Sequence, residues 1–271
     1  ALLPAVIINN NDKITLYSHP GASYGGIVYG KNISFKLIND IIIAIDKYCK
    51  IMKFDSVLLI NTPNIYFQNY NEDENYLLSF NKFIVCERYI SHIVKLKKKD
   101  ELLNLLSKRK QRYINNGSFK EFKFKSSTDF KSFYAILLNS KKLYKTKPTH
   151  SLQELKKIKK LFPSKCELLL SYHKNQLVGG AFLIIVNKKV CLVFYNVINE
   201  NYRGTQLSSF QLYHCMIKAV KFGCGLIDFG VSQTPKGENP LAPKLSLIKF
   251  KEQFGAKGII RTVYKKNYDY D

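Results

Sequence analysis

The stretch YNVINENYRGTQLSSFQLYHCMIKAVKFGCGLIDFGVS, residues 195–232, contains the pattern that decides the fold. A strand ends at Tyr195 and Asn196, an amphipathic helix follows over 205–222, and a second strand runs into Asp228. Parallel strands joined by one helix form a crossover unit, and ligands bind at the carboxyl ends of such strands. The stretch therefore predicts an α/β fold with a binding crevice near these polar residues.

The segments around this stretch alternate strands and helices in an order that repeats. The second half predicts β-α-α-β-β-β-α-β-α-β, and the first half repeats its tail as hairpin, strand, helix, strand. We expect an α/β fold (α+β layout) of tandem domains with mixed, largely antiparallel sheets, the first copy truncated at its start. The predicted helices are 35–52, one capped by Asp100, 128–144, 152–161, 205–222 and 245–250; the strands are 56–63, 83–96, 119–125, 166–172, 177–186, 190–197, 226–229 and 259–264, with a hairpin turn at 9–12 and a polar loop before residue 83.

The domain boundary is predicted where the helix capped by Asp100 ends at Asn116–Gly117. Residues 1–116 then form the first lobe and residues 117–271 the second, and we leave open that the last strand returns to the first lobe. An intact first copy would need about 40 to 60 more residues upstream, judged from the opening of the second copy. Because the chain does not begin with Met, its numbering could start inside a longer protein.

The strong positive charge is carried mainly by lysine. The net charge is +23, and of the 43 basic residues only five are Arg. Proteins that read base sequence usually rely on the planar fork of Arg, so we expect no DNA partner. Much of the charge, including the basic run 108–112, is typical of a solvated surface, with a salt-sensitive attraction to polyanions such as RNA.

The cysteine pattern and the apolar runs limit the cellular setting. The six cysteines form no CxxC pair, and the histidines at 92, 173 and 214 lack metal-ligand spacing, so we expect free thiols and no metal. No apolar run reaches the roughly 18 residues of a membrane helix, and no signal peptide is visible. We therefore expect a cytoplasmic protein that makes at most transient contact with the inner-membrane surface.

Several short motifs carry a family resemblance in their order. These are Gly-Gly-Ala entering a strand at 179–181, the Tyr-Asn strand end, the helix ending at Gly223, Asp-Phe-Gly-x-Ser closing at Ser232, and Phe-Lys-x-x-Phe-Gly at 250–255. Together they resemble the second domain of FemAB-like acyltransferases of the GNAT superfamily, close to the BioF2-like set. The stretch SHPGASYGGIVYG, residues 18–30, is similar to the first domain of the same family.

The resemblance implies an N-acyltransferase that acts on an amine of a cell-envelope precursor. The acceptor would be an amino sugar of a surface polysaccharide, in nucleotide-linked form, or a peptidoglycan precursor. The donor would be acyl-CoA or another acyl thioester, with aminoacyl-tRNA as the alternative. The phosphate-binding signature of CoA-dependent members is reduced to NENYRGTQL, and the helical arm of some tRNA-dependent members is absent. The competing hypothesis is a non-catalytic RNA- or polyanion-binding module that keeps the fold.

By the same resemblance, Lys251 is the residue that would stabilise the transition state, since an ammonium on a flexible arm can follow the developing oxyanion. Phe250 would shape the donor pocket. Asp228 would accept a proton or orient the amine, although a carboxylate at a strand end is as often a loop cap. With Phe250 and Phe254 on one helical face, we expect the Lys251 side chain to be free and to point at the crevice.

The remaining candidates are polar residues on turns and at strand ends. Arg203 and Gly204 precede a helix whose free N–H groups favour an anion, although Arg203 is equally well explained as a surface cation. A glycine-rich turn could hydrogen-bond a sugar or phosphate, or simply provide turn geometry. The complete set of expected substrate-binding residues is Phe250, Tyr195, Asn196, Ser232, Arg203, Gly204, His19, Ser23 and Tyr24.

Overall fold

The chain folds into two compact units. The computed structural model describes residues 1–67, 69–143, 145–233, 239 and 241–270. The first unit comprises residues 1–90, 233–243 and 259–271, and the second comprises residues 91–232 and 244–258. Residues 91–116, assigned from sequence to the first lobe, therefore group with the second unit, and most of the last strand groups with the first.

The first unit is a sheet with helices packed against it. Its strand order is β1-β2-β3-β10-β4, in which β2 and β3 are parallel and β10 pairs antiparallel with β3. The hairpin of β1 and β2 turns at Asn11 and Asp12, as the sequence predicts. The elements are β1 (Val6–Asn10), β2 (Lys13–Tyr17), α1 (Phe35–Ile51), β3 (Ser56–Ile60), η1 (Asn64–Tyr66), α2 (Asp73–Phe80), β4 (Ile84–Lys95) and β10 (Lys257–Asn267), the last two also entering the second unit.

Helix α1 forms where the apolar spacing predicts it. The Ser34 side chain accepts a hydrogen bond from Leu37 N at 3.2 Å and caps the first turn. Ile38, Ile42 and Cys49 repeat at helical spacing and are buried in one cluster with Val57 and Leu59 of the sheet. This packing creates the core of the first unit.

The second unit contains the predicted meander and crossover. Its strand order is β4-β9-β8-β7-β6-β5, and only the pair β8 and β9 is parallel. The elements are η2 (Lys99–Leu105), α3 (Lys108–Asn115), η3 (Ser118–Glu121), β5 (Phe122–Ser127), α4 (Phe130–Lys142), α5 (Leu152–Leu161), β6 (Cys166–His173), β7 (Gln176–Ile185), β8 (Val190–Ile198), η4 (Glu200–Tyr202), α6 (Leu207–Lys221), β9 (Leu226–Val231) and α7 (Leu245–Glu252).

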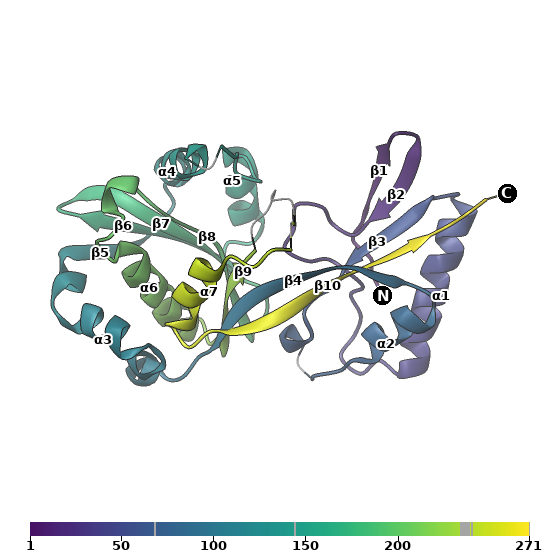
Figure 1. The fold of residues 1–271 in the computed structure, drawn as a ribbon, viewed down its shortest axis with the longest axis horizontal. Helices are drawn as coiled ribbons and strands as arrows, with labels where there is room; N and C mark the ends of the chain where they lie inside the picture. Colours follow the sequence, from purple (N-terminus) through teal and green to yellow (C-terminus); the bar gives the residue numbers. More distant parts are fainter. Residues whose placement is uncertain (68, 144, 234–238, 240, 271) are drawn as a thin grey trace. The chain divides into compact units, whose positions relative to one another are not determined.

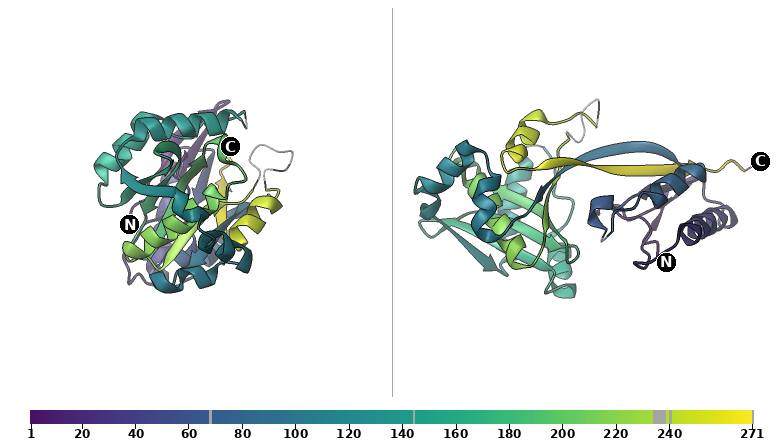
Figure 2. Two further views of the ribbon diagram at one scale, coloured as in Figure 1. Left: turned by 90° about the vertical axis from the view of Figure 1, so that its left-hand side faces the viewer. Right: turned by 90° about the horizontal axis from the view of Figure 1, so that it is seen from below.

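Both faces of this sheet are buried. Leu168 and Leu170 pack with α4 and α5, whereas Leu169 between them packs with α6. Alternation of side chains along a strand explains why one apolar run serves two cores. Helices α4 and α5 cover one face of β6 to β8, and α6 covers the other (Figures 1 and 2).

Two predicted segments differ from the structure. The loop expected before residue 83 contains helix α2. The single helix expected after Asp100 is a 3-10 segment, η2, followed by α3, which begins after Ser107. Ser107 N donates to Gln253 O at 2.8 Å and Ser107 Oγ accepts from Lys110 N at 3.4 Å, so a tertiary contact and a new cap interrupt the helix.

The fold class is confirmed. The protein is a mixed α/β structure whose strands pair largely antiparallel, and the first unit repeats the second from its hairpin onward.

Candidate active site

The carboxyl end of β9 is the centre of the site. Parallel pairing of β8 with β9 runs from Val190↔Leu226 to Leu192↔Asp228, although both strands continue beyond these residues. The register of β8 against β7 shifts at Phe194, and β9 carries one extra residue opposite β4 near Gly230. Two irregularities therefore lie where the parallel pairing stops, the position at which α/β sheets bind ligands.

Asp228 holds the turn at this strand end. The carboxylate is fully buried, and its Oδ1 accepts hydrogen bonds from Ser91 Oγ at 2.7 Å and from Gly230 N at 2.6 Å. Gly230 has φ of 77°, a left-handed conformation that glycine adopts at no steric cost. The carboxylate thus acts at least as a cap, which is the structural alternative that the sequence leaves open.

Lys251 lies in α7 and is buried, with 4% of its surface exposed. Its ammonium donates to Gly230 O at 2.7 Å, to Val231 O at 2.9 Å and to Ser232 Oγ at 2.9 Å. The expectation of a free side chain is therefore wrong. A buried ammonium requires hydrogen-bond acceptors in place of water, and the irregular end of β9 provides two carbonyl groups and a hydroxyl.

His92 extends this network and was missed by the sequence reasoning. Its Nδ1 lies 2.8 Å from Ser232 Oγ, and the ring is 3% exposed. Burial, together with the positive charge of Lys251, lowers the pKa of His92 below its ordinary value of 6.5. The available signal was a pair of polar residues, Ser91 and His92, inside an apolar strand, since buried polar side chains need partners.

Phe250 packs into the second unit beside Lys251. Its ring meets that of Phe254 edge-on at 5.5 Å, and Phe254 meets Phe229 at 5.7 Å. Lys110 Nζ lies 4.9 Å from the centre of the Phe250 ring. These contacts anchor the segment that carries Lys251.

Tyr195 and Asn196, at the end of β8, have other partners. Tyr195 Oη lies 3.1 Å from His150 Nδ1, and burial raises the pKa of the tyrosine. Asn196 Oδ1 accepts from Gln211 Nε2, and its Nδ2 donates to Ser208 Oγ at 3.4 Å. Among the described residues no hydrogen bond links either side chain to Lys251, so the structure brings together Asp228, Ser232 and Lys251 but leaves these two outside their network.

Arg203 and Gly204 lie just before α6. Arg203 pairs with Glu200 at 3.2 Å and half of its side chain is exposed, while Gly204 has φ of 89° and open space around it. Helix α6 follows Gln206, a left-handed residue whose side chain does not cap the helix. In place of a capping side chain, the Lys110 side chain lies at the N-terminus of α6.

The Lys110 ammonium donates to Gln206 Oε1 at 2.8 Å and to Ser209 Oγ at 2.6 Å. Burial, with a smaller contribution from Arg109, lowers the pKa of Lys110 to about 8. A cation at a helix N-terminus also faces the positive end of the helix dipole. The sequence reasoning treated this lysine as part of a solvated run.

His19, Ser23 and Tyr24 lie in the first unit. Ser23 O accepts from Arg261 Nη1 at 3.0 Å, and the Arg261 guanidinium lies 5.8 Å from the centre of the Tyr24 ring. His19 has φ of 52°, as expected of a turn residue. The contacts of these residues are those of an anchored turn.

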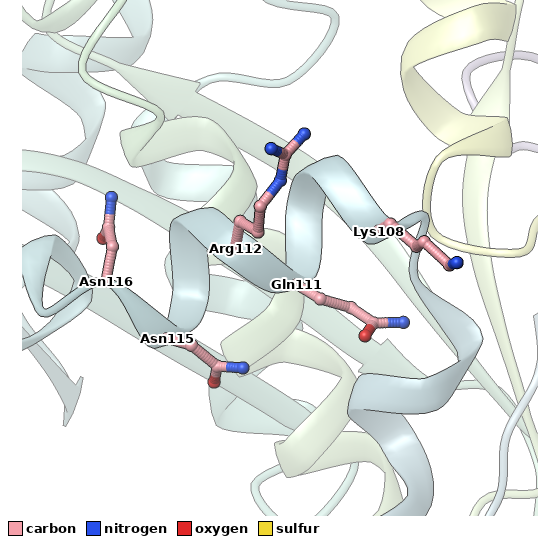
Figure 3. A pocket seen from close by; sticks show the side chains of 5 residues that line it. All are labelled: Lys108, Gln111, Arg112, Asn115 and Asn116. Carbon is pink, nitrogen blue, oxygen red and sulfur yellow. The ribbon is translucent and has the colours of Figure 1, made fainter.

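A hollow of about 850 Å³ lies along α3. It is lined by Lys108, Gln111, Arg112, Asn115 and Asn116. Figure 3 shows Arg112 and Asn116 pointing to one side of the helix and Asn115 to the other, so the polar groups do not converge on a common point. This geometry is typical of the solvated basic surface that the sequence predicts.

The described part of the chain has neither a cluster of metal ligands nor a membrane-spanning helix. No group of three or more His, Cys, Asp or Glu side chains there could hold a metal ion. None of the described helices combines the length and the apolar character needed to cross a bilayer.

Comparison with solved structures identifies the fold. FemX matches 97% of this chain and 84% of its own length with a TM-score of 0.75, at 12% sequence identity. The chain has the FemX fold. The fold expected from the motifs, that of FemAB-like proteins, is thereby confirmed.

Two further structures share this fold. One is the C-terminal domain of an Agrobacterium fabrum protein named as a lysylphosphatidylglycerol synthetase, with a TM-score of 0.63, 9% identity, and coverage of 98% of this chain and 85% of that one. The other is a Bacteroides thetaiotaomicron protein of unknown function, with a TM-score of 0.61, 10% identity, and coverage of 99% and 84%. No protein-family model and no curated protein sequence matches the chain.

Proposed function

We propose that the protein is an N-acyltransferase that moves an acyl or aminoacyl group onto an amine of a cell-envelope precursor. The observation that carries the proposal is the buried ammonium of Lys251 at the end of β9, in a chain with the FemX fold. A neutral amine attacks an ester or thioester carbonyl, and negative charge develops on the carbonyl oxygen. A fixed, desolvated cation stabilises that charge more strongly than a solvated one.

Lys251 would act mainly through its charge. Gly230 O, Val231 O and Ser232 Oγ occupy its three N–H donors, so a direct bond to the oxyanion requires exchange of one of them. Asp228 would order the strand end, because two donors already engage its Oδ1. This arrangement favours the orienting role of Asp228 over proton acceptance.

The other candidates would bind the two substrates. Arg203 and Gly204, ahead of α6, would hold the phosphate groups of a CoA thioester or of aminoacyl-tRNA. Phe250 would shape the donor pocket, and Tyr195, Asn196 and Ser232 would also bind substrate. In the first unit, His19, Ser23 and Tyr24 would hydrogen-bond a sugar or phosphate. The degenerate phosphate loop and the absent helical arm leave both donor classes open, and the likeness to a protein named as a lysylphosphatidylglycerol synthetase keeps an aminoacyl donor under consideration.

Product analysis tests the proposal. The purified chain is incubated with acetyl-CoA, longer acyl-CoA thioesters or a mixture of aminoacyl-tRNAs, each with UDP-linked amino sugars or a UDP-linked muramyl peptide. Mass spectrometry should find an amide product in at least one combination, absent with Lys251→Met and retained with Lys218→Met. The Lys218 control also loses polar contacts of a lysine in the second unit, to Ser126 and Glu167, away from the site.

Two results would reject the proposal. One is salt-sensitive RNA binding without turnover of any donor, which favours the non-catalytic polyanion-binding module. The other is equal transfer by the Lys251 and Lys218 variants, which removes Lys251 from the mechanism.

A further inference from the structure

The hydrogen-bond chain from Lys251 through Ser232 ends on His92. Nζ of Lys251 lies 2.9 Å from Ser232 Oγ, and Ser232 Oγ lies 2.8 Å from His92 Nδ1. All three side chains are at least nine-tenths buried. These hydrogen bonds link α7 and the end of β9 with β4, which lies more than a hundred residues earlier in the sequence.

The chemistry of the groups fixes the direction of the first bond, and the tautomer of His92 determines that of the second. An ammonium can only donate, so Lys251 donates to Ser232 Oγ. A hydroxyl can both accept and donate, so Ser232 Oγ donates its own hydrogen to His92 Nδ1 when that nitrogen carries no proton. The imidazole is then neutral, with its proton on Nε2.

We propose that His92 is a positioning residue that fixes the Lys251 ammonium through Ser232. This inference rests on the proposed function, in which Lys251 stabilises the oxyanion. As long as His92 accepts, the lone pairs of Ser232 remain directed at Lys251. A protonated His92 donates instead, which reverses its bond to Ser232 and places a second cation next to Lys251 in a buried site.

The charged groups around His92 favour its neutral form. Lys251 and burial both lower its pKa, while Glu252 on α7 and Asp228 on β9 raise it by less, so the net direction is below 6.5. The contribution of His92 to transfer should therefore be constant above that pH and should decline on acidification through the lowered pKa, in addition to any dependence on the acceptor amine. If the decline in transfer at low pH disappears when a non-titrating acceptor replaces His92, the decline is caused by protonation of His92. We call this decline the acid limb.

Two variants distinguish a role of His92 in positioning Lys251 from a general role in stabilising the fold. His92→Asn places an oxygen acceptor near the Nδ1 position, and His92→Leu removes the acceptor. We expect His92→Leu to lower kcat about tenfold with KM within about twofold, as for the loss of one positioning hydrogen bond. His92→Asn should stay within about twofold of wild type and lose the acid limb. His173→Asn is the matched control, because His173 Nδ1 also contacts a hydroxyl, that of Tyr202 at 3.1 Å, outside this network.

A nuclear magnetic resonance experiment tests the inference without any substrate. With ¹⁵N-labelled histidine, long-range ¹⁵N–¹H correlations of the full chain should report the Nε2-protonated tautomer for His92. The ¹⁵N ammonium resonance of Lys251, assigned by its loss in Lys251→Arg, should shift or disappear in His92→Leu and persist in His92→Asn and His173→Asn. An Nδ1-protonated His92, or an unchanged Lys251 resonance in a folded His92→Leu variant, would overturn the proposal. If these resonances behave as expected and no donor is turned over, the failure lies with the proposed function.

Discussion

Lys251 and Lys110 are two buried lysines of the second unit with opposite surroundings. Lys251 lies at the carboxyl end of β9, where two backbone carbonyl oxygens and a hydroxyl accept its hydrogens. Lys110 lies at the amino end of α6, where an amide oxygen and a hydroxyl accept and the rings of Phe250, Phe254 and Tyr113 surround the charge. At a strand end, unpaired carbonyl groups take the place of water around an ammonium. At a helix N-terminus, the positive end of the helix dipole repels the ammonium.

The difference shows that two equally buried lysines can be held by acceptors of different kinds. The acceptors of Lys110 can satisfy each other, since Ser209 Oγ lies 3.1 Å from Gln206 Oε1. The two carbonyl groups that accept from Lys251 cannot hydrogen-bond to each other, because a carbonyl cannot donate. The lysine at β9 is thus the one whose removal leaves unsatisfied groups behind.

Replacement of each lysine by Met gives the largest contrast. Lys251→Met should reduce transfer about 10²- to 10³-fold, by analogy with loss of one oxyanion-stabilising group, and should destabilise the protein by about 1–3 kcal/mol. Lys110→Met should cost less than about 1 kcal/mol, because a desolvated charge is removed together with its bonds. Urea unfolding and initial-rate assays measure both, and equal destabilisation would break the comparison.

Removal of the Asp228 carboxylate tests the strand end itself. Asp228→Ala leaves Ser91 Oγ and Gly230 N without their acceptor and should cost about 2 kcal/mol. Asp228→Asn keeps an oxygen that can accept both bonds and should cost less than half of that. Chemical denaturation compares the two, and a pair of equal losses would show that charge, not hydrogen bonding, orders this turn.

Substitution of Gly230 probes the turn with a smaller effect. Its φ of 77° is strained for any residue with a Cβ, although open space surrounds the position, so Gly230→Ala should cost about 1 kcal/mol. Gly225→Ala, with similar open space and no left-handed backbone, serves as the control. Thermal unfolding would contradict this account if the two variants were equally stable.

The pH dependence of Lys110 tests the charge of the second lysine directly. Its pKa in the folded chain is about 8, below the ordinary 10.5, so between these values the unfolded chain binds more protons. The penalty for burying the charge is therefore present in full below pH 8 and diminishes as the pH rises toward 10.5. The stability of wild type relative to Lys110→Met should increase over this interval in urea titrations, and a flat difference would exclude the lowered pKa.

The order of elements in the second unit could be predicted because local patterns determine it. Apolar periodicity and turn residues locate β6, β7, β8 and α6 within a few residues. Helix α2 was missed, since its short polar sequence carries little apolar periodicity. The break at Ser107 could not be predicted, because it depends on a contact with Gln253.

The candidate site was predicted in part for a related reason. Motif order pointed to Phe250, Lys251 and Ser232, and a place at a strand end pointed to Asp228; their roles stay predictions. The burial of Lys251 and the participation of His92 depend on one extra residue in β9 opposite β4. Such a register shift is a property of paired strands, and no single segment encodes it.

The position of β10 has a consequence for synthesis of the chain. In the strand order β10 lies between β3 and β4, yet every other described strand is translated before it. The first unit therefore cannot complete its sheet when its own amino-terminal residues leave the ribosome, as amino-terminal domains commonly do. Until residues 257–267 emerge, the nascent chain carries two strands with exposed, unpaired edges, the state in which β proteins are most prone to aggregate and in which a chaperone has most to protect.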